Sequence, residues 1–294
     1  MTITAREIAS QPEVWRKSLE FLDVARELLV RPGEKMLVIG CGTSAFVAES
    51  FAALREAAGF GLTDAAYASE PRVWRDYDRV IALTRSGTTS EILDALRAFP
   101  AGVPTTVVTA VAAAPVHDLV DDALVLYFAD EESVVQTRFP TTFLLLARAA
   151  FGENVDDIIA DAESTLALPL TLPVDVASLD HFVYLGTGWT YGLAQEAALK
   201  IREAAQAWSE SYPLLDFRHG PLAVAHAGSL VWMLGRSDIG LIGQIEATGA
   251  HVVASGRDGL IDLVQAQRLA VELAGVRGLN PDQPRHLTRS IILT

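Results

Sequence analysis

Apolar residues along the chain follow two alternating patterns. Short and almost wholly apolar runs in the first half predict β-strands, at Met36–Ile39, Val80–Leu83, Thr106–Val111 and Leu124–Phe128. Between them, apolar positions recur at helical spacing and predict helices, at Ala45–Ala58, Ser90–Phe99 and Thr141–Phe151. Strands that are apolar on both faces and alternate with helices are typical of a parallel sheet covered on both sides.

The second half repeats this alternation in a shorter form. The expected elements are strand His181–Leu185, a long helix over about 191–210, strand Leu230–Leu234, helix Ile239–Ala247, strand His251–Ser255 and helix Leu260–Leu273. A helix over residues 13–30 is predicted before the first strand. A polar helix over about 156–166 and the stretch Pro169–Pro173 separate the halves.

One strand-to-helix turn occurs in both halves. At a single offset of about half of the 294 residues, the matching pairs are Gly40 with Gly186, Gly42 with Gly188, Ser44 with Thr190 and Ala48 with Ala194. Self-similarity at a fixed offset indicates a duplicated unit, and chance similarity of a short turn is the alternative. We expect an α/β protein of two tandem units, each a flavodoxin-like three-layer α/β/α sheet. The expected boundaries are a helical segment at 1–34, a first unit at 35–168, and a second unit with a C-terminal tail at 169–294.

Composition limits which binding partners and which cellular compartment are expected. The net charge of −14 would repel polyanions, so we expect neither nucleic acid nor an anionic membrane as a partner. The uncharged stretch Val103–Val116 is short and contains two prolines, so it is not expected to span a bilayer. Cys41 is the single cysteine, and no basic segment precedes an apolar run at the start of the chain. These features predict a cytoplasmic protein without a disulfide.

Hydroxyl-rich turns are the strongest candidates for anion binding. Residues 84–90 (TRSGTTS) carry five hydroxyls and one guanidinium just before a predicted helix. A simple helix cap, the alternative, needs one hydroxyl.

Residues 40–44 (GCGTS) also precede a helix. Their glycine spacing fits the fingerprint of a dinucleotide-binding turn, but no acidic residue ends the next strand, as that fingerprint requires. The hydroxyls of Thr43 and Ser44 suit a phosphate monoester better than a pyrophosphate. The third set, 137–142 (TRFPTT), is equally compatible with an ordinary helix start.

The long helix of the second half carries three ionisable residues on one face. Glu196, Lys200 and Glu203 follow the spacing i, i+4, i+7 among many alanines. An exposed ion pair is the alternative and is slightly favoured by spacing alone. His219 precedes Gly220-Pro221 and is therefore expected on a loop, where a lone histidine is more often a surface residue than a catalytic one.

These features together resemble the sugar isomerase (SIS) domain family, above all the isomerase half of glutamine–fructose-6-phosphate amidotransferase and its stand-alone relatives. The matching stretches are residues 7–12 (EIASQP), 41–44 (CGTS), 68–70 (ASE), 86–89 (SGTT), 141–142 (TT), 185–188 (LGTG), 196–203 (EAALKIRE), 218–222 (RHGPL) and 282–287 (DQPRHL). They run in order along nearly the whole chain, so the two units would be SIS units.

The resemblance implies a phosphorylated sugar as the ligand. Its phosphate would be held by Ser44, Thr84, Arg85, Ser86 and Thr89. Glu203 would move a proton between C1 and C2, with Lys200 beside it, and His219 would help to open the sugar ring from the partner subunit of a homodimer. Further candidates for contact with the substrate are Thr43, Gln136, Thr137, Glu196 and Arg289. No metal and no cofactor is expected.

Two departures qualify the resemblance. The glutaminase half of the amidotransferase is missing from this sequence, and Arg289 stands where the family has a lysine that forms a Schiff base with the open sugar. We therefore expect an isomerase, or a deaminase or deglycase, acting on a hexose or hexosamine 6-phosphate. The alternative is a non-catalytic, regulatory phosphosugar-binding protein. A nucleotide-dependent oxidoreductase is a more distant alternative.

Overall fold

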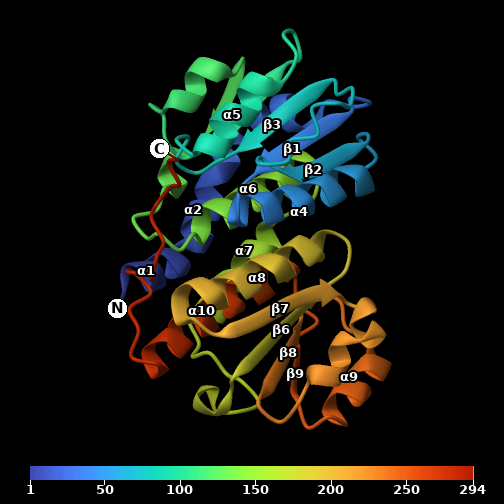
Figure 1. Ribbon diagram of the computed structural model, residues 1–294, viewed down its shortest axis with the longest axis vertical. Coiled ribbons are helices and arrows are strands. Elements are labelled where there is room, and N and C mark those ends of the chain that lie inside the picture. The colour runs from blue at the N-terminus through green and yellow to red at the C-terminus, as the bar shows by residue number, and fades with distance from the viewer. Residues whose placement is uncertain (294) are drawn as a thin grey trace.

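Two parallel sheets organise the chain in the computed structural model, which describes residues 1–293 (Figure 1). The first sheet has the strand order β2-β1-β3-β4-β5, with bounds β1 Met36–Gly40, β2 Thr63–Tyr67, β3 Arg79–Leu83, β4 Thr105–Thr109 and β5 Asp122–Val125. The second has the order β7-β6-β8-β9, with bounds β6 His181–Gly186, β7 Trp208–Pro213, β8 Ser229–Met233 and β9 His251–Ala254. The expected α/β class with parallel sheets is confirmed.

Helices cover both faces of each sheet. Their bounds are α1 Ile3–Ala9, α2 Gln11–Ser18, α3 Leu22–Ala25, α4 Thr43–Ala57, α5 Ser90–Ala98, α6 Arg138–Ala150, α7 Asp156–Leu166, α8 Trp189–Ala205, α9 Ile239–Glu246 and α10 Gly259–Val276. Helices α4, α6, α8 and α10 lie between the two sheets (Figure 1). Helix α5 packs on the outer face of the first sheet and α9 on the outer face of the second.

The core explains why the central strands are apolar along much of their length. Along β1, Val38 joins the large core between the sheets, whereas its neighbours Leu37 and Ile39 join the smaller core under α5. All five residues of β1 are buried, as are those of β3 and β4. A strand buried on both faces cannot alternate apolar with polar residues, so periodicity alone identifies it only as a short apolar run.

Three expectations about elements are wrong. The helix expected over 191–210 ends at Ala205, because Gln206 adopts a left-handed conformation with φ 51°, and residues 208–213 form β7. Strand β2 was not anticipated. Both β2 and β7 are edge strands with partly exposed residues, so neither has the apolar run of a central strand. The helix expected over 13–30 is interrupted after Ser18 and continues as short helical turns to Val30.

The repeated turn has the same conformation in both halves. Gly42 has φ 52° and ψ −124°, and Gly188 has φ 58° and ψ −128°, a region that favours glycine. A Cβ on Gly40 would overlap the backbone of Ser44, and a Cβ on Gly186 would overlap that of Thr190. Both glycines let a helix start directly above the end of a strand. The boundaries of the expected units stay a prediction.

Replacing Gly186 with alanine should lower the free energy of unfolding by about 1–3 kcal/mol, because the turn must shift to admit the methyl group. Gly243→Ala is the matched control, since nothing lies within 4 Å of its Cβ position in α9. That control should raise stability by about 0.5–1 kcal/mol through helix propensity. Urea unfolding curves measure both, and equal midpoints for the two variants would contradict the close approach at Gly186.

Candidate active site

A small cavity lies at the carboxyl ends of β1 and β3. In the strand order β2-β1-β3, the chain passes from β1 to β2 on one side and then crosses over to β3 on the other side of β1. Ligands of open α/β sheets bind at such a reversal of strand order. The cavity has a volume of about 30 Å³. Its lining consists of Cys41, Ser44, Leu83, Thr84, Arg85, Ser86, Thr89, Ile92, Gln136 and Arg289. The structure thus brings together every residue that the sequence proposed for the phosphate.

The hydroxyls that line the cavity divide into two groups. The Thr84 hydroxyl accepts from the Gly87 amide at 3.2 Å, and the Ser86 hydroxyl accepts from the Thr88 amide at 3.3 Å, so both brace the turn itself. Gly87 has φ 66°, and a Cβ there would lie 2.6 Å from the Cβ of Ala114. Within residues 1–293, the hydroxyls of Ser44 and Thr89 make no hydrogen bond. Because Thr84 and Ser86 only accept within the turn and keep their own hydroxyl protons, all four hydroxyls remain donors for a ligand in the cavity.

Arg85 brings a positive charge into this cavity. Its side chain is buried, and it donates to the backbone carbonyls of Ser133 and Arg289, each at 2.8 Å. No carboxylate in the described part of the chain lies within 4.0 Å of its guanidinium, and its Nε has no hydrogen-bond partner there. The carboxamide oxygen of Gln136 also lacks a partner within residues 1–293. A buried charge without a carboxylate in direct contact is costly, and the carboxylates that act on Arg85 do so only from a longer distance, so this arrangement suits an anionic ligand.

Helix α8 carries a second group of candidate residues. The Lys200 ammonium lies 3.2 Å from Glu196, 2.5 Å from Glu203 and 3.1 Å from the hydroxyl of Thr43. Lys200 and Glu196 are fully buried, whereas the Glu203 side chain keeps 19% of its surface exposed. The alternative of an exposed ion pair is therefore wrong. The alanines of α8 allow its close packing on α4, where Gly192 lies against the backbone of Phe46.

Burial sets the charge states of this cluster. Desolvation raises the pKa of Glu196 to about 7, against the opposing effect of Lys200. Burial alone would lower the pKa of Lys200, but the two neighbouring carboxylates raise it overall. Glu203 is then the accessible carboxylate of the group, held by a lysine that stays protonated. Such a carboxylate can accept a proton from a ligand in front of it.

The start of α4 joins the two groups. Thr43 and Ser44 are consecutive, and their side chains serve different groups: Thr43 contacts Lys200, and Ser44 lines the cavity. The two groups of candidate residues therefore meet at the start of α4.

Three candidates are placed elsewhere or differently. His219 is an exposed residue at the end of a helical turn at residues 216–219, and its imidazole makes no hydrogen bond within the described chain. The Thr137 hydroxyl and amide both donate to the Glu131 carboxylate at the start of α6, and Thr137 does not line the cavity. The Arg289 guanidinium donates to both carboxylate oxygens of Asp130 at 2.6 Å.

The contacts of the C-terminal tail with the start of α5 were not predicted from the sequence. Ser290 bonds to Thr88 at 3.0 Å, the Ile291 carbonyl accepts from the Ser90 amide at 3.1 Å, and the Leu293 amide donates to the Ser90 hydroxyl at 2.9 Å. The tail thus returns from α10 to the start of α5 (Figure 1). Cys41, Leu83 and Ile92 were also missed as lining residues, because apolar side chains near a turn carry no signal of their own.

Residues 1–293 hold neither the ligand cluster of a metal site nor a membrane-spanning helix. No group of three or more His, Cys, Asp or Glu side chains with the arrangement of a metal site occurs there. No helix in that range is long and apolar enough to cross a membrane.

Comparisons with known proteins agree with this geometry, although no family model matches the chain. The glutamine–fructose-6-phosphate aminotransferase (isomerizing) of Clostridium acetobutylicum is 28% identical over 99% of this chain, and 56% of that enzyme is covered. The aminotransferase of Caldanaerobacter subterraneus is 24% identical over 93% of this chain and 54% of its own length. The chain thus spans about half the length of these curated relatives.

Solved structures extend the similarity to proteins of this length. The crystal structure of a glucosamine-6-phosphate deaminase from Thermotoga maritima has a TM-score of 0.87 and 26% identity, with 99% of this chain and 100% of that chain covered. A tagatose-6-phosphate ketose/aldose isomerase from Escherichia coli, at 20% identity, shares the fold with a TM-score of 0.77, over 99% of this chain and 96% of its own. Over nearly its whole length, the chain therefore resembles the sugar isomerase (SIS) domain proteins, which include the isomerase half of the aminotransferase and phosphosugar isomerases and deaminases.

Proposed function

We propose that this chain is an enzyme that acts on a hexose or hexosamine 6-phosphate, as an aldose–ketose isomerase or as a deaminase or deglycase. One observation supports this most strongly: the guanidinium of Arg85 is buried at a hydroxyl-lined cavity without a carboxylate partner. The accessible carboxylate of Glu203, held by Lys200 on the neighbouring helix, supplies a base beyond the anion site.

In the proposed reaction, the phosphate is held by Arg85 and by the hydroxyls of Ser44, Thr84, Ser86 and Thr89. Glu203 accepts the proton from C1 or C2 of the open sugar to give an enediol and returns it to the other carbon. Meanwhile the proton of the hydroxyl on one of these carbons passes to the carbonyl oxygen of the other, so that aldose and ketose interconvert without loss of atoms. Lys200 stays protonated and keeps the carboxylate in place. These steps need no metal and no cofactor.

His219 has a place in this proposal only in a homodimer of two-SIS-unit chains. Its imidazole is exposed and makes no contact with Glu203 in its own chain. We propose that it reaches the site of the partner subunit, where it promotes opening of the sugar ring. The unit boundaries at residues 35, 168 and 169 and a cytoplasmic location belong to the same proposal.

A thermal-shift panel tests the substrate class. Glucose, fructose, glucosamine and tagatose 6-phosphates are compared with the same sugars without phosphate and with inorganic phosphate. We expect at least one 6-phosphate to raise the melting temperature, while its unphosphorylated form does not. No shift with any phosphosugar would contradict the proposal. Binding without turnover would favour the alternative, a non-catalytic phosphosugar-binding protein.

Arg289 bears on which reaction is catalysed. A guanidinium stays protonated and is a poor nucleophile, so it cannot form a Schiff base with an open sugar. Borohydride with fructose 6-phosphate should leave no sugar adduct in the tail of the native protein by mass spectrometry, and ammonia with this sugar should yield no glucosamine 6-phosphate. Arg289→Lys is the matched variant and should gain an adduct. An adduct on the native tail, or efficient formation of glucosamine 6-phosphate, would contradict the prediction that Arg289 prevents Schiff-base chemistry in this chain.

A further inference from the structure

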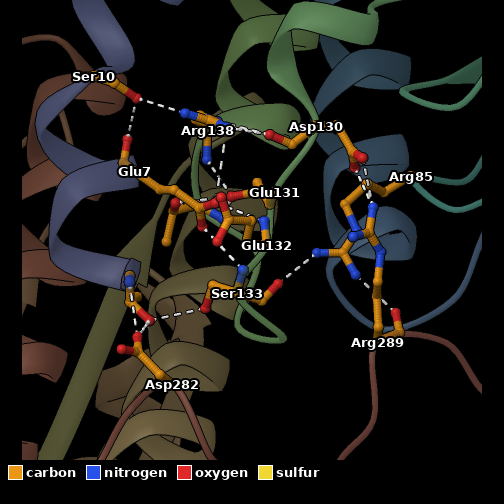
Figure 2. Close-up of polar contacts among 12 residues, drawn as sticks. Glu7, Ser10, Arg85, Asp130, Glu131, Glu132, Ser133, Arg138, Asp282 and Arg289 are labelled. Atoms are coloured by element: carbon orange, nitrogen blue, oxygen red, sulfur yellow. Dashed lines mark hydrogen bonds and ion pairs between the residues drawn. The ribbon is translucent and has the colours of Figure 1, made fainter. Parts of the chain in front are cut away.

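The N-terminal helix α1 contacts a loop that lies beside the candidate phosphate cavity (Figure 2). Glu7 of this helix is 4% exposed. Its carboxylate accepts from the backbone amide of Glu132 at 2.7 Å and from that of Ser133 at 3.4 Å. Glu7 is therefore a buried acceptor for two consecutive amides of the segment between β5 and α6. The reaction proposed above makes no use of this residue.

The same peptide segment holds Arg85. The Ser133 amide points to Glu7, while the Ser133 carbonyl accepts from Nη1 of Arg85 at 2.8 Å (Figure 2). We infer that Glu7 is a positioning residue of the phosphate site, which fixes residues 132–133 and, through the Ser133 carbonyl, the guanidinium of Arg85. For its effect on ligand affinity, this inference rests on the proposed function.

Arg85 also contacts the C-terminal tail. The other terminal nitrogen of Arg85 donates to the Arg289 carbonyl at 2.8 Å. Nearer to α10, the Asp282 carboxylate accepts from the amides of Ile3 and Thr4 at 2.8 and 2.9 Å, at the start of α1. The tail is thus held by α1 near residue 282 and by Arg85 near residue 289, where the contacts with Asp130 and with the start of α5 also hold it. Loosening Arg85 should weaken this second attachment, even when no ligand is bound.

Charges around Glu7 make the arrangement sensitive to pH. Burial raises the pKa of Glu7 to about 7, the Glu131 carboxylate adds to this rise, and Arg138, 3.8 Å away, opposes it together with the two loop amides. Arg85 also lies within electrostatic range. Because the carboxylate accepts the amides best when ionised, Glu7 should support the phosphate site more strongly at pH 8 than at pH 6.

Hydrogen–deuterium exchange on the full-length Glu7→Gln protein without ligand tests the inference first. Glutamine keeps the size of the side chain but replaces one acceptor oxygen with a donor. We expect at least tenfold faster exchange for the amides of residues 132–133 and for the Leu293 amide at the tail. Glu13→Gln is the matched control, because this exposed carboxylate of α2 loses the same charge and has no contact with the loop. It should leave both segments at native rates.

Calorimetry with glucosamine 6-phosphate then measures the effect on binding. Glu7→Gln should weaken affinity roughly five- to tenfold at pH 8, and the ratio to the native protein should shrink toward about twofold at pH 6. Comparison at each pH cancels the ionisation of the phosphate itself. In turnover assays the change should appear in KM and leave kcat within about twofold. Glu7→Asp, which keeps the charge at a shorter reach, should be intermediate and replaces the glutamine variant if that variant does not fold.

Several outcomes would overturn the inference. Native exchange rates at residues 132–133 would show that Glu7 does not fix the loop. Faster exchange at residues 132–133, with native exchange of the tail and native affinity for the sugar, would show that the loop does not position Arg85. If the native protein binds no phosphosugar, the proposed function fails, and the exchange rate of the tail still decides whether Glu7 acts on Arg85.

Discussion

Glu203→Gln is expected to lower turnover of the phosphosugar substrate by about 10²–10⁴-fold and to leave its affinity within about twofold. Glutamine matches glutamate in size but cannot accept a proton from carbon. The remaining contacts of the ligand, above all those of Arg85 and the hydroxyls of the cavity, do not involve this side chain. The loss should therefore fall on kcat.

Steady-state kinetics and calorimetry on the same preparations measure the two quantities. Glu272→Gln is the matched control, because it removes an exposed carboxylate of α10 away from the site and should keep native turnover. Native turnover in Glu203→Gln would reject Glu203 as the base. A parallel loss of affinity would instead show that the carboxylate binds the sugar.

The combined replacement Ser86→Ala with Thr89→Ala should weaken phosphosugar binding at least tenfold. A hydrogen bond to a charged group contributes about 1.5–3 kcal/mol, and both hydroxyls line the cavity. The hydroxyl of Thr89 has no other hydrogen-bond partner in residues 1–293, so removing this hydroxyl should cost little stability. Ser86 also accepts from Thr88 within the turn, which the variant gives up.

Calorimetry with the phosphosugar measures this change, and the unphosphorylated sugar serves as the ligand control. Ser164→Ala removes an exposed hydroxyl of α7 and is the matched protein control, which should bind as the native chain does. Unchanged affinity in the double variant would place the phosphate site elsewhere.

The central part of the fold could be predicted from sequence because its signals are local. Strands β1 and β3 are buried on both faces and appear as apolar runs, and the glycines at 40, 42, 186 and 188 mark turns that only glycine fits. Edge strands β2 and β7 were missed because half of their surface is polar or exposed. The end of α8 was missed because a left-handed residue at Gln206, with no glycine there, stops the helix.

The candidate site shows the same division. The hydroxyls near residue 86 and the stripe of Glu196, Lys200 and Glu203 are close in sequence, so spacing alone could group them. Burial of Lys200 could not be predicted, because it depends on how α8 packs against α4. Contacts between distant segments carry no spacing signal, which is why the loop at Ser133 and the role of Glu7 emerged only from the structure.

Proton exchange at C1 and C2 of a bound phosphosugar tests the proposed function most directly. The native protein is incubated in deuterium oxide with the 6-phosphate that gives the largest thermal shift, and the sugar is followed by proton NMR. We predict deuterium at C1 of the ketose or C2 of the aldose with the native protein, and a rate lower by about 10²–10⁴-fold with Glu203→Gln. Binding of the sugar without any exchange at these carbons would contradict the enzymatic account and leave a phosphosugar-binding protein.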